Sequence, residues 1–290
     1  MSTAEMGQGA ELEEIVFRAL AEDVGPGDVT TMATVSAHSH GIARVLAQEP
    51  GVFSGLEVVR EVIRLSDPAV TFDQEWEDGK TFAAGDVLFV LRGRSRSLLT
   101  MERVLLNFIQ RLSGIATLTR RYVDAIAGTG AEITDTRKTT PGLRPLEKAA
   151  VRHGGGVNHR MGLYDAFLIK NNHITAAGGL AAAVGLARAS EIKMHLTVEA
   201  RTMEEVAEAA PLEVDQIMLD NMDPPAIARA VEVIRRAQSG LQRARPVLIE
   251  VSGGVNLENA RSRAVPGVDL VSVGALTHSV RSLDLAMRLE

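Results

Sequence analysis

Residues 131–144 read A-E-I-T-D-T-R-K-T-T-P-G-L-R, and residues 153–172 read H-G-G-G-V-N-H-R-M-G-L-Y-D-A-F-L-I-K-N-N. Each segment contains a short apolar run typical of a strand, Ala131–Thr134 in the first and Ala166–Ile169 in the second. An Arg-Lys pair follows the first run after two residues, and a lysine follows the second run directly. The two segments therefore predict strands that deliver basic side chains at their carboxyl ends.

The two segments together contain four cations, Arg137, Lys138, Arg160 and Lys170, with His159 beside Arg160; of these, Arg137, Lys138 and Lys170 follow the strand-like runs. Several cations held at strand ends suit a substrate that is small and heavily anionic. The formal net charge of the whole chain is −6. Because the cations cluster against an acidic background, a local electrostatic purpose is favoured over a general one.

From Ala131 onward, strand-like and helix-like runs alternate, which is typical of a parallel α/β fold. We expect strands at Ala131–Thr134, Ala166–Ile169, Met194–Val198, Gln216–Leu219, Val247–Val251 and Asp269–Val273. We expect helices near Leu146–Arg152, Leu180–Ala189, Met203–Ala209, Pro225–Gln238 and Leu257–Arg263. Right-handed crossovers curl such a sheet toward a barrel, but a closed eight-unit barrel takes about 200 residues or more. The prediction is therefore an incomplete, open parallel α/β barrel.

The first part of the chain predicts a separate, antiparallel α/β layer. Helix-like runs lie at Glu11–Asp23 and Gly55–Leu65, and strand-like runs at Gly41–Gln48, Ala69–Trp76 and Asp86–Leu91. A long helix is expected over Ser97–Ile126, interrupted near Ser113–Gly114, and a last helix over Val280–Leu289. We thus expect an N-terminal α/β sandwich over residues 1–114 and an open barrel over 115–276, with a helix within 277–290 packing back on the sandwich.

Composition excludes several classes of protein. Apolar residues make up 46% of the 290 residues, which is enough for a sizeable core. The absence of cysteine excludes disulfides, thiolate nucleophiles and cysteine-ligated metals. No apolar run reaches membrane-spanning length, and the polar, acidic start at Met1–Glu14 is not a secretory signal, so we expect a cytoplasmic protein with no membrane partner. The acidic balance also argues against nucleic-acid binding.

Reactive groups of parallel α/β barrels gather where the strands end. After successive strands come Asp135-Thr136-Arg137-Lys138, Lys170-Asn171-Asn172, Glu199, Asp220-Asn221, Ser252-Gly253-Gly254 and Gly274-Ala275. Glycine turns let backbone N–H groups approach an anion, and a following helix adds its dipole. Helix starts are expected at Asn256 and at Thr277–Ser279. The last two turns therefore predict a phosphate site.

Two sets of side chains leave alternatives open. Glu199 and Asp220 either bind sugar hydroxyls or hold Mg²⁺ through water, or they form structural ion pairs with Lys170 or Lys138. His159 suits a general base, a donor to a substrate carboxylate or a structural histidine, and the charge of Arg160 disfavours its charged form. His153, His173 and His195 fit no metal-ligand spacing and are interpreted as structural. Arg103 and Arg111, in the long helix, read from spacing alone as solvated side chains.

The motifs taken together resemble the quinolinate phosphoribosyltransferase family. They are T-D-T-R-K-T-T-P-G-L-R, G-G-G-V-N-H-R-M-G-L-Y-D, L-I-K-N-N-H, M-L-D-N-M, V-S-G-G-V and S-V-G-A-L-T-H-S, with E-D-V-G-P-G-D-V-T-T and E-R-V-L-L-N-F-I-Q-R-L-S-G-I-A-T nearer the N-terminus. They occur in order over nearly the whole chain. The resemblance implies a type II phosphoribosyltransferase fold and a homodimer with shared active sites.

The resemblance also implies the reaction and the residues. Quinolinate and phosphoribosyl pyrophosphate would give nicotinate mononucleotide, pyrophosphate and CO₂ with Mg²⁺, a step of NAD biosynthesis. Arg137, His159, Arg160 and Lys170 look like the quinolinate pocket, and Arg103 resembles an arginine supplied by the partner subunit. Phosphate contacts are implied at Lys138, Ser252, Gly253, Gly254, Val273, Gly274 and Ala275, and Thr136 is expected among the substrate-binding residues. Glu199 and Asp220 resemble carboxylates on the ribose and metal side, which with Arg103, Arg137, Lys138 and Lys170 would make up the catalytic residues.

One position departs from the family pattern. The third strand commonly reads E-V-E in the family, whereas this chain has Thr197-Val198-Glu199. Residues two apart on a strand point the same way, so one carboxylate is missing from that face. Two other functions are compatible with the scaffold: action on another pyridine carboxylate or in molybdenum-related metabolism, and a non-catalytic sensor of phosphoribosyl ligands.

Overall fold

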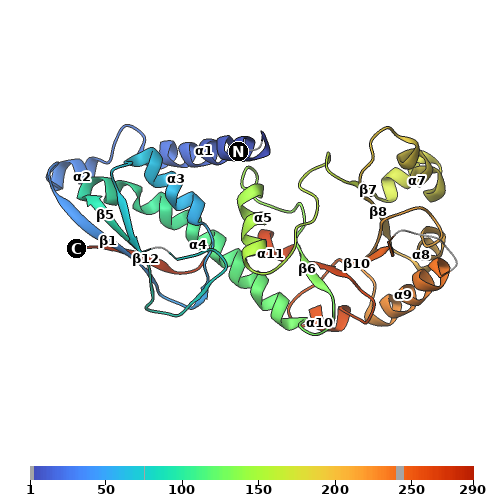
Figure 1. Ribbon diagram of the computed structural model, residues 1–290. Helices are drawn as coiled ribbons and strands as arrows, with labels where there is room; N and C mark the ends of the chain where they lie inside the picture. Colours follow the sequence, from blue (N-terminus) through green and yellow to red (C-terminus); the bar gives the residue numbers. More distant parts are fainter. Residues whose placement is uncertain (1–2, 75, 240–244) are drawn as a thin grey trace. The chain divides into compact units, whose positions relative to one another are not determined.

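The computed structural model describes residues 3–74, 76–239 and 245–290 (Figure 1). The chain divides into two compact units. Unit 1 contains Met1–Leu118, Thr140–Gly154 and Val280–Glu290, and unit 2 contains Thr119–Thr139 and Gly155–Ser279. Each unit has its own sheet and its own hydrophobic core.

Unit 2 is built on a six-stranded parallel sheet in the order β6-β11-β10-β9-β8-β7. Strands β6 and β7 are the two edges, and no pairing joins them in the described part of the chain, so the sheet does not close. The predicted open α/β architecture is therefore confirmed. The strands are β6 (Glu132–Thr134), β7 (Phe167–Ile169), β8 (Leu196–Ala200), β9 (Gln216–Asp220), β10 (Leu248–Ser252) and β11 (Leu270–Ser272).

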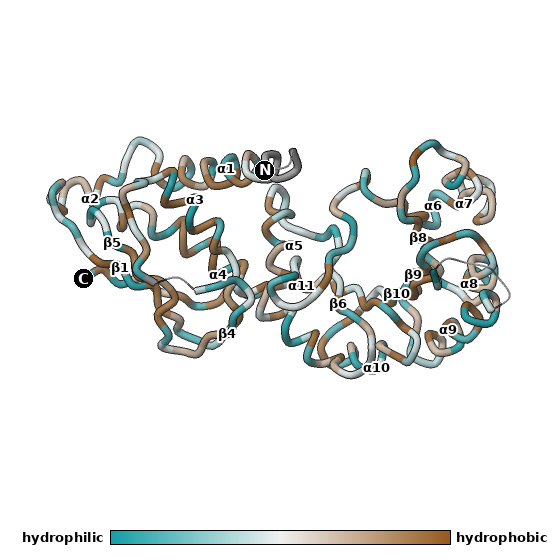
Figure 2. The backbone as a smooth tube through the Cα atoms, viewed as in Figure 1, coloured by the Kyte–Doolittle hydropathy of each residue, from teal (hydrophilic) through white to brown (hydrophobic). Residues whose placement is uncertain are grey.

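Two of the helices that follow strands in unit 2 begin at capping side chains. Thr202 accepts a hydrogen bond from the backbone N–H of Glu205 to start α8 (Met203–Ala209), and Asp223 accepts one from Ala226 to start α9 (Pro224–Gln238). Both hydrophobic and hydrophilic residues occur along α9 (Figure 2). Its buried residues, Ile227, Ala230, Val231 and Ile234, recur at the spacing of one helix face, as expected for a helix with one face in the core. The other helices are α6 (Asn171–Ala177), α7 (Leu180–Ala189), α10 (Ala260–Arg263) and α11 (Ala275–His278).

Unit 1 has a four-stranded antiparallel sheet in the order β12-β1-β5-β3 and a two-stranded ribbon, β2-β4. Its strands are β1 (His40–Ala47), β2 (Gly51–Val52), β3 (Thr71–Gln74), β4 (Thr81–Phe82), β5 (Val87–Arg94) and β12 (Leu285–Leu289). Its helices are α1 (Thr3–Val24), α2 (Val29–Thr34), α3 (Leu56–Ser66), α4 (Ser95–Ala125) and α5 (Arg144–His153). Phe53 and Phe89 meet edge to face at 5.1 Å in its core.

The prediction of a C-terminal helix within 277–290 is wrong. Residues Leu285–Leu289 form β12, which pairs antiparallel with β1. Leu285 is buried at the start of β12, whereas Arg288 and Leu289 at its end are exposed. Leucine, alanine, methionine and arginine are good helix formers, so local propensity favours a helix. The unpaired backbone groups along the edge of β1 override that preference.

The long helix is also not interrupted at Ser113–Gly114, because α4 runs through both residues. A Cβ at Gly114 would lie 2.4 Å from the carbonyl oxygen of Arg281, so this glycine allows close backbone packing within unit 1. The unit boundary differs from the predicted one at 114/115, since 140–154 and 280–290 belong to unit 1. Residues 1, 2 and 75, within the predicted sandwich and the predicted strand Ala69–Trp76, lie outside the described residues.

His153 predicts how the stability of the protein depends on pH. Its Nδ1 lies 2.9 Å from the Ser54 hydroxyl and 3.8 Å from a carboxylate oxygen of Asp78. Burial lowers the pKa of His153 below its ordinary 6.5, against the opposing charge of Asp78. The unfolded chain then binds a proton at a higher pH than the folded chain does, so stability is lost as pH falls below about 6.5.

We expect the free energy of unfolding to decrease between about pH 7.5 and about pH 5.5, and to decrease less in the His153→Gln variant. Urea unfolding of both proteins at each pH measures the difference. Equal pH dependence of the two proteins would show that His153 contributes nothing to it.

Candidate functional site

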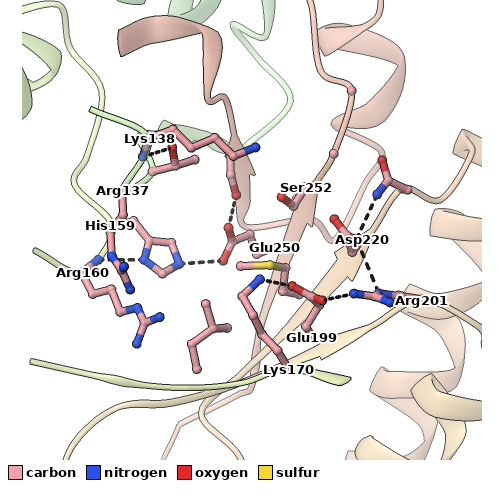
Figure 3. A pocket seen from close by; sticks show the side chains of 17 residues that line it. Arg137, Lys138, His159, Arg160, Lys170, Glu199, Arg201, Asp220, Glu250 and Ser252 are labelled. Carbon is pink, nitrogen blue, oxygen red and sulfur yellow. Dashed lines mark hydrogen bonds and ion pairs between the residues drawn. The ribbon is translucent and has the colours of Figure 1, made fainter. Parts of the chain in front are cut away.

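A cavity of about 540 Å³ opens in unit 2 where the parallel strands end. Eleven of the predicted site residues line it (Figure 3): Thr136, Arg137, Lys138, His159, Arg160, Lys170, Glu199, Asp220, Ser252, Gly253 and Gly254. They come from segments far apart in the sequence and meet because parallel strands present their carboxyl ends at one edge. The cavity lies within the size range of small-molecule sites.

Four predicted residues do not line this cavity. Arg103 belongs to α4 in unit 1, where its guanidinium is half exposed and 4.0 Å from Glu102. Val273 is fully buried and donates its backbone N–H to Thr134. Gly274 packs against a residue that lines the cavity, since a Cβ there would lie 3.2 Å from the side chain of Lys138. Ala275 begins α11.

One side of the cavity is cationic. Figure 3 shows Arg137, His159 and Arg160 together there. Arg160 donates from Nη1 to the carbonyl oxygen of Ala166 at 3.0 Å, whereas its buried Nε–H has no hydrogen-bond partner among the described residues. Burial, followed by the like charge of Arg137, lowers the pKa of Arg160. A buried N–H group without an acceptor destabilises the folded protein, and a bound anion would supply that acceptor. This side of the cavity is therefore suited to an anion.

The opposite side holds two carboxylates among cations (Figure 3). Glu199 receives Lys170 on one oxygen and Arg201 on the other, the latter at 3.0 Å. Arg201 Nε also lies 3.8 Å from Asp220, which accepts a hydrogen bond from Asn221 at 2.9 Å. The predicted structural ion pair between Glu199 and Lys170 is therefore present.

The glycine turn after β10 requires glycine for steric reasons. Gly253 has φ +87°, and a Cβ there would lie 2.2 Å from the side-chain oxygen of Asn221. Among the described residues, Asn221 is the non-glycine residue with positive φ, at +58°. Sparsely populated backbone conformations cluster at ligand sites.

The predicted helix starts beside the two glycine turns are wrong. In place of a helix at Asn256, a hydrogen-bonded turn between Asn256 and Asn259 precedes α10. Helix α11 begins at Ala275, ahead of Thr277–Ser279. Helices α10 and α11 have four residues each, which is too short for a large helix dipole. These turns therefore offer an anion their backbone N–H groups.

Comparison with known proteins decides the family. The N-terminal domain of quinolinate phosphoribosyl transferases matches residues 28–113, and the C-terminal domain matches residues 115–288. The chain belongs to the quinolinate phosphoribosyltransferase family. It is 44% identical over 281 residues to the nicotinate-nucleotide pyrophosphorylase [carboxylating] of Mycobacterium leprae, covering 95% of this chain and 96% of that one. It is 38% identical over 296 residues to quinolinate phosphoribosyltransferase [decarboxylating] 1b of Nicotiana tabacum, covering 97% and 83%.

Solved structures agree with this family assignment. A crystal structure of NadC from Streptococcus pyogenes superposes with a TM-score of 0.89 at 41% identity, covering 96% of each chain. The nicotinate-nucleotide pyrophosphorylase from Francisella tularensis superposes with a TM-score of 0.88 at 36% identity, covering 97% of this chain and 96% of that one. The fold of this chain is thus that of the quinolinate phosphoribosyltransferase family.

Several cavity residues of this family member were missed from sequence: Leu168, Arg201, Met218, Asn221, Glu250 and Ser272. Arg201 lies one residue past the end of β8, at the same edge as the predicted residues. Glu250 gave a clearer signal, because it is a lone charged residue between Ile249 and Val251 in an apolar strand. A charge in a buried strand has to find partners or carry a function.

The carboxylates do not form an all-protein metal site. Among the described residues, no group of three or more aspartates, glutamates or histidines converges on one point. Both oxygens of Glu199 are occupied by Lys170 and Arg201, and the contacts of Asp220 use its Oδ2. Mg²⁺ commonly takes one or two carboxylates and completes its ligands with water and substrate phosphates. The donors present fit a cation of that kind, with Asp220 as the less occupied carboxylate.

None of the described helices is both long enough and apolar enough to cross a membrane.

Proposed function

We propose that this chain transfers a phosphoribosyl group from phosphoribosyl pyrophosphate to quinolinate with loss of CO₂, giving nicotinate mononucleotide and pyrophosphate. The proposal is supported by the family assignment and by the names of the relatives. The observation that carries it is the buried Nε–H of Arg160, without a hydrogen-bond partner in the described residues, beside a second guanidinium on Arg137. Quinolinate supplies two carboxylates for such a pair.

The charges of the cavity match two anionic substrates. Its lining carries Arg137, Lys138, Arg160, Lys170 and Arg201. Quinolinate and phosphoribosyl pyrophosphate repel each other, so they meet only where cations neutralise both. A hydrogen bond to a charged group contributes about 1.5–3 kcal/mol, so no single cation is sufficient. The protein therefore works mainly by holding the two reactants in contact and screening their charge.

In the proposed reaction, pyrophosphate leaves C1 of the ribose, and the ring nitrogen of quinolinate forms the new bond to that carbon. The positive charge of the quaternised ring stabilises the electron pair left on the adjacent carbon when its carboxylate departs as CO₂, and that carbon then takes up a proton from solvent water, which gives nicotinate mononucleotide. Glu199 and Asp220 face positive charge that develops on the ribose, and Lys138 with the Gly253–Gly254 turn faces the phosphates. No side-chain nucleophile is required for these steps.

Mg²⁺ is part of the proposal. Asp220, and Glu199 through water, would hold it together with the diphosphate, where it supplies charge neutralisation to the leaving group. In this arrangement Arg201 bridges the two carboxylates and offsets part of their charge before substrate arrives.

Release of CO₂ from carboxyl-labelled quinolinate tests the function. We expect release that requires both phosphoribosyl pyrophosphate and Mg²⁺, with nicotinate mononucleotide formed in equal amount. Nicotinate offered in place of quinolinate is the control and should not be converted, because it lacks the second carboxylate. Tight binding of both substrates without turnover would indicate a sensor instead and would overturn the proposed activity.

We further propose a cytoplasmic homodimer in which Arg103 of the partner subunit completes each cavity. Arg103 is half exposed and does not line the cavity of its own chain. Mixing the Arg103→Ala and Lys138→Ala variants, each inactive alone, should restore activity, since a mixed dimer contains one intact site. Random exchange predicts about a quarter of the wild-type activity. Absence of recovery, with subunit exchange verified by mass spectrometry, would exclude a shared site.

A further inference from the structure

A buried carboxylate lies at the base of the cavity and has no part in the steps above. Glu250, in the middle of β10, is fully buried and lines the cavity with its carboxylate. It accepts hydrogen bonds from the hydroxyl of Ser272 and the amide of Gln216. Its third contact is His159, whose Nε2 lies 3.5 Å from the carboxylate, as Figure 3 shows. An ionised carboxylate without water is stable only with such a set of donors.

The contacts of His159 determine where its proton lies. Its Nδ1 accepts the backbone N–H of Arg160 at 2.7 Å, so the proton of the neutral ring is on Nε2, which faces Glu250. Its own backbone N–H donates to the buried carboxylate of Asp135 at 2.9 Å. Both ring nitrogens and the backbone are thus used inside the protein. A histidine held in this way is poorly placed to act as a general base.

We propose that Glu250 is a positioning residue that acts through His159. Through its contact with the Nε2–H group, Glu250 orients the imidazole of His159. The Nδ1 atom of the ring then accepts the backbone N–H of Arg160 and holds that backbone in place. The guanidinium of Arg160 is thereby presented to the substrate anion. This inference rests on the proposed function in one respect, namely that the anion bound by Arg160 is a carboxylate of quinolinate.

The other partners of Glu250 explain why a carboxylate is needed. The Oε1 of Gln216 is 3.0 Å from Nε2 of His195, which turns the Gln216 amide so that its N–H₂ donates to Glu250. Three donors therefore converge on Glu250. A carboxylate offers only acceptors, whereas the side-chain amide introduced by the Glu250→Gln substitution would turn an N–H₂ group toward one of these donors. We expect that variant to release His159.

A second consequence concerns charge. A carboxylate beneath an anion site repels the substrate unless donors cover it, and two of the donors to Glu250, His159 and Ser272, line the cavity. Removing His159 would expose the charge of Glu250 to quinolinate. Neutralising Glu250 in the same protein should remove that repulsion. The two substitutions are therefore expected to be non-additive.

Kinetics give the first test. Glu250→Gln is expected to raise KM for quinolinate about tenfold while KM for phosphoribosyl pyrophosphate stays within about twofold. Glu132→Gln, which removes an exposed carboxylate from β6 of the same sheet, is the matched control and should match wild type. The double variant His159→Ala/Glu250→Gln should be no worse than His159→Ala. If the losses multiply, or if both KM values rise equally, Glu250 does not act through His159.

Nitrogen NMR of the ¹⁵N-histidine-labelled protein gives a test that needs no turnover. The His159 resonances, assigned by their loss in His159→Ala, should report a proton on Nε2 and none on Nδ1. The Glu250→Gln variant should shift the Nε2 signal. A proton on Nδ1 in wild type, or no shift in the variant, would overturn the proposal. If CO₂ release fails but these signals behave as expected, the proposed activity is wrong and the Glu250–His159 contact stands.

Discussion

Arg160→Ala is expected to lower kcat/KM for quinolinate by between about tenfold and a hundredfold, which corresponds to the loss of one hydrogen bond to a charged group. The loss is expected because the Nε–H of Arg160 is buried with no acceptor among the described residues, and a substrate carboxylate supplies one. Burial lowers the pKa of Arg160, and the positive charge of neighbouring Arg137 lowers it further. The two guanidinium groups therefore repel each other in the absence of substrate. Bound substrate converts this repulsion into attraction.

Steady-state rates with varied quinolinate measure the effect. Arg160→Lys keeps the charge but loses the planar pair of donors, so its rate should fall between those of wild type and the alanine variant. Arg229→Ala, on the exposed face of α9, is the matched control for loss of one arginine. Near-normal turnover of Arg160→Ala would remove the quinolinate pocket from this side of the cavity.

Gly253→Ala is expected to weaken binding of phosphoribosyl pyrophosphate at least about tenfold. The backbone there has φ +87°, which an L side chain rarely adopts, and the added Cβ would lie 2.2 Å from the Asn221 oxygen. Asn221 is hydrogen-bonded to Asp220 and to the backbone of Ser252, so it cannot move aside without disturbing the cavity. The turn would therefore shift away from the phosphate.

Gly128→Ala separates strain from contact. Gly128 has φ +81° with nothing within 4 Å of an added Cβ, so this variant carries similar backbone strain at an open position. Both variants should lose some stability, and only Gly253→Ala should lose affinity in calorimetric titration with phosphoribosyl pyrophosphate. Equal affinities for the two variants would place the phosphate elsewhere.

Sequence patterns predicted most of unit 2 because its signals are local. Alternating apolar runs place strands and helices within a few residues of their observed bounds, as for Leu180–Ala189 and Met203–Ala209. The cations and carboxylates at strand ends could be grouped without coordinates, since parallel strands share one edge. That reasoning correctly brought Arg137, Lys170 and Asp220 to one cavity.

Where the pattern failed, a distant segment decided the outcome. The helix expected near the C-terminus is a strand because the edge of β1, more than two hundred residues earlier, offers unpaired backbone groups. Gly114 looked like a helix break because its partner, the carbonyl of Arg281, is invisible from local sequence. Arg201 was missed because its role depends on which carboxylates surround it.

The sequence by itself determined most of the order of strands and helices in unit 2, the open parallel sheet and the identity of the cations that meet at its edge, because periodicity and strand direction are properties of the local chain. Only the tertiary structure decided which atoms those side chains use. Whether His159 faces substrate or Glu250, and whether Glu199 is available or already paired with Lys170, depends on short contacts between residues that are far apart in the sequence. Hydrogen bonds and ion pairs act over such short distances, and spacing along the chain does not encode these contacts.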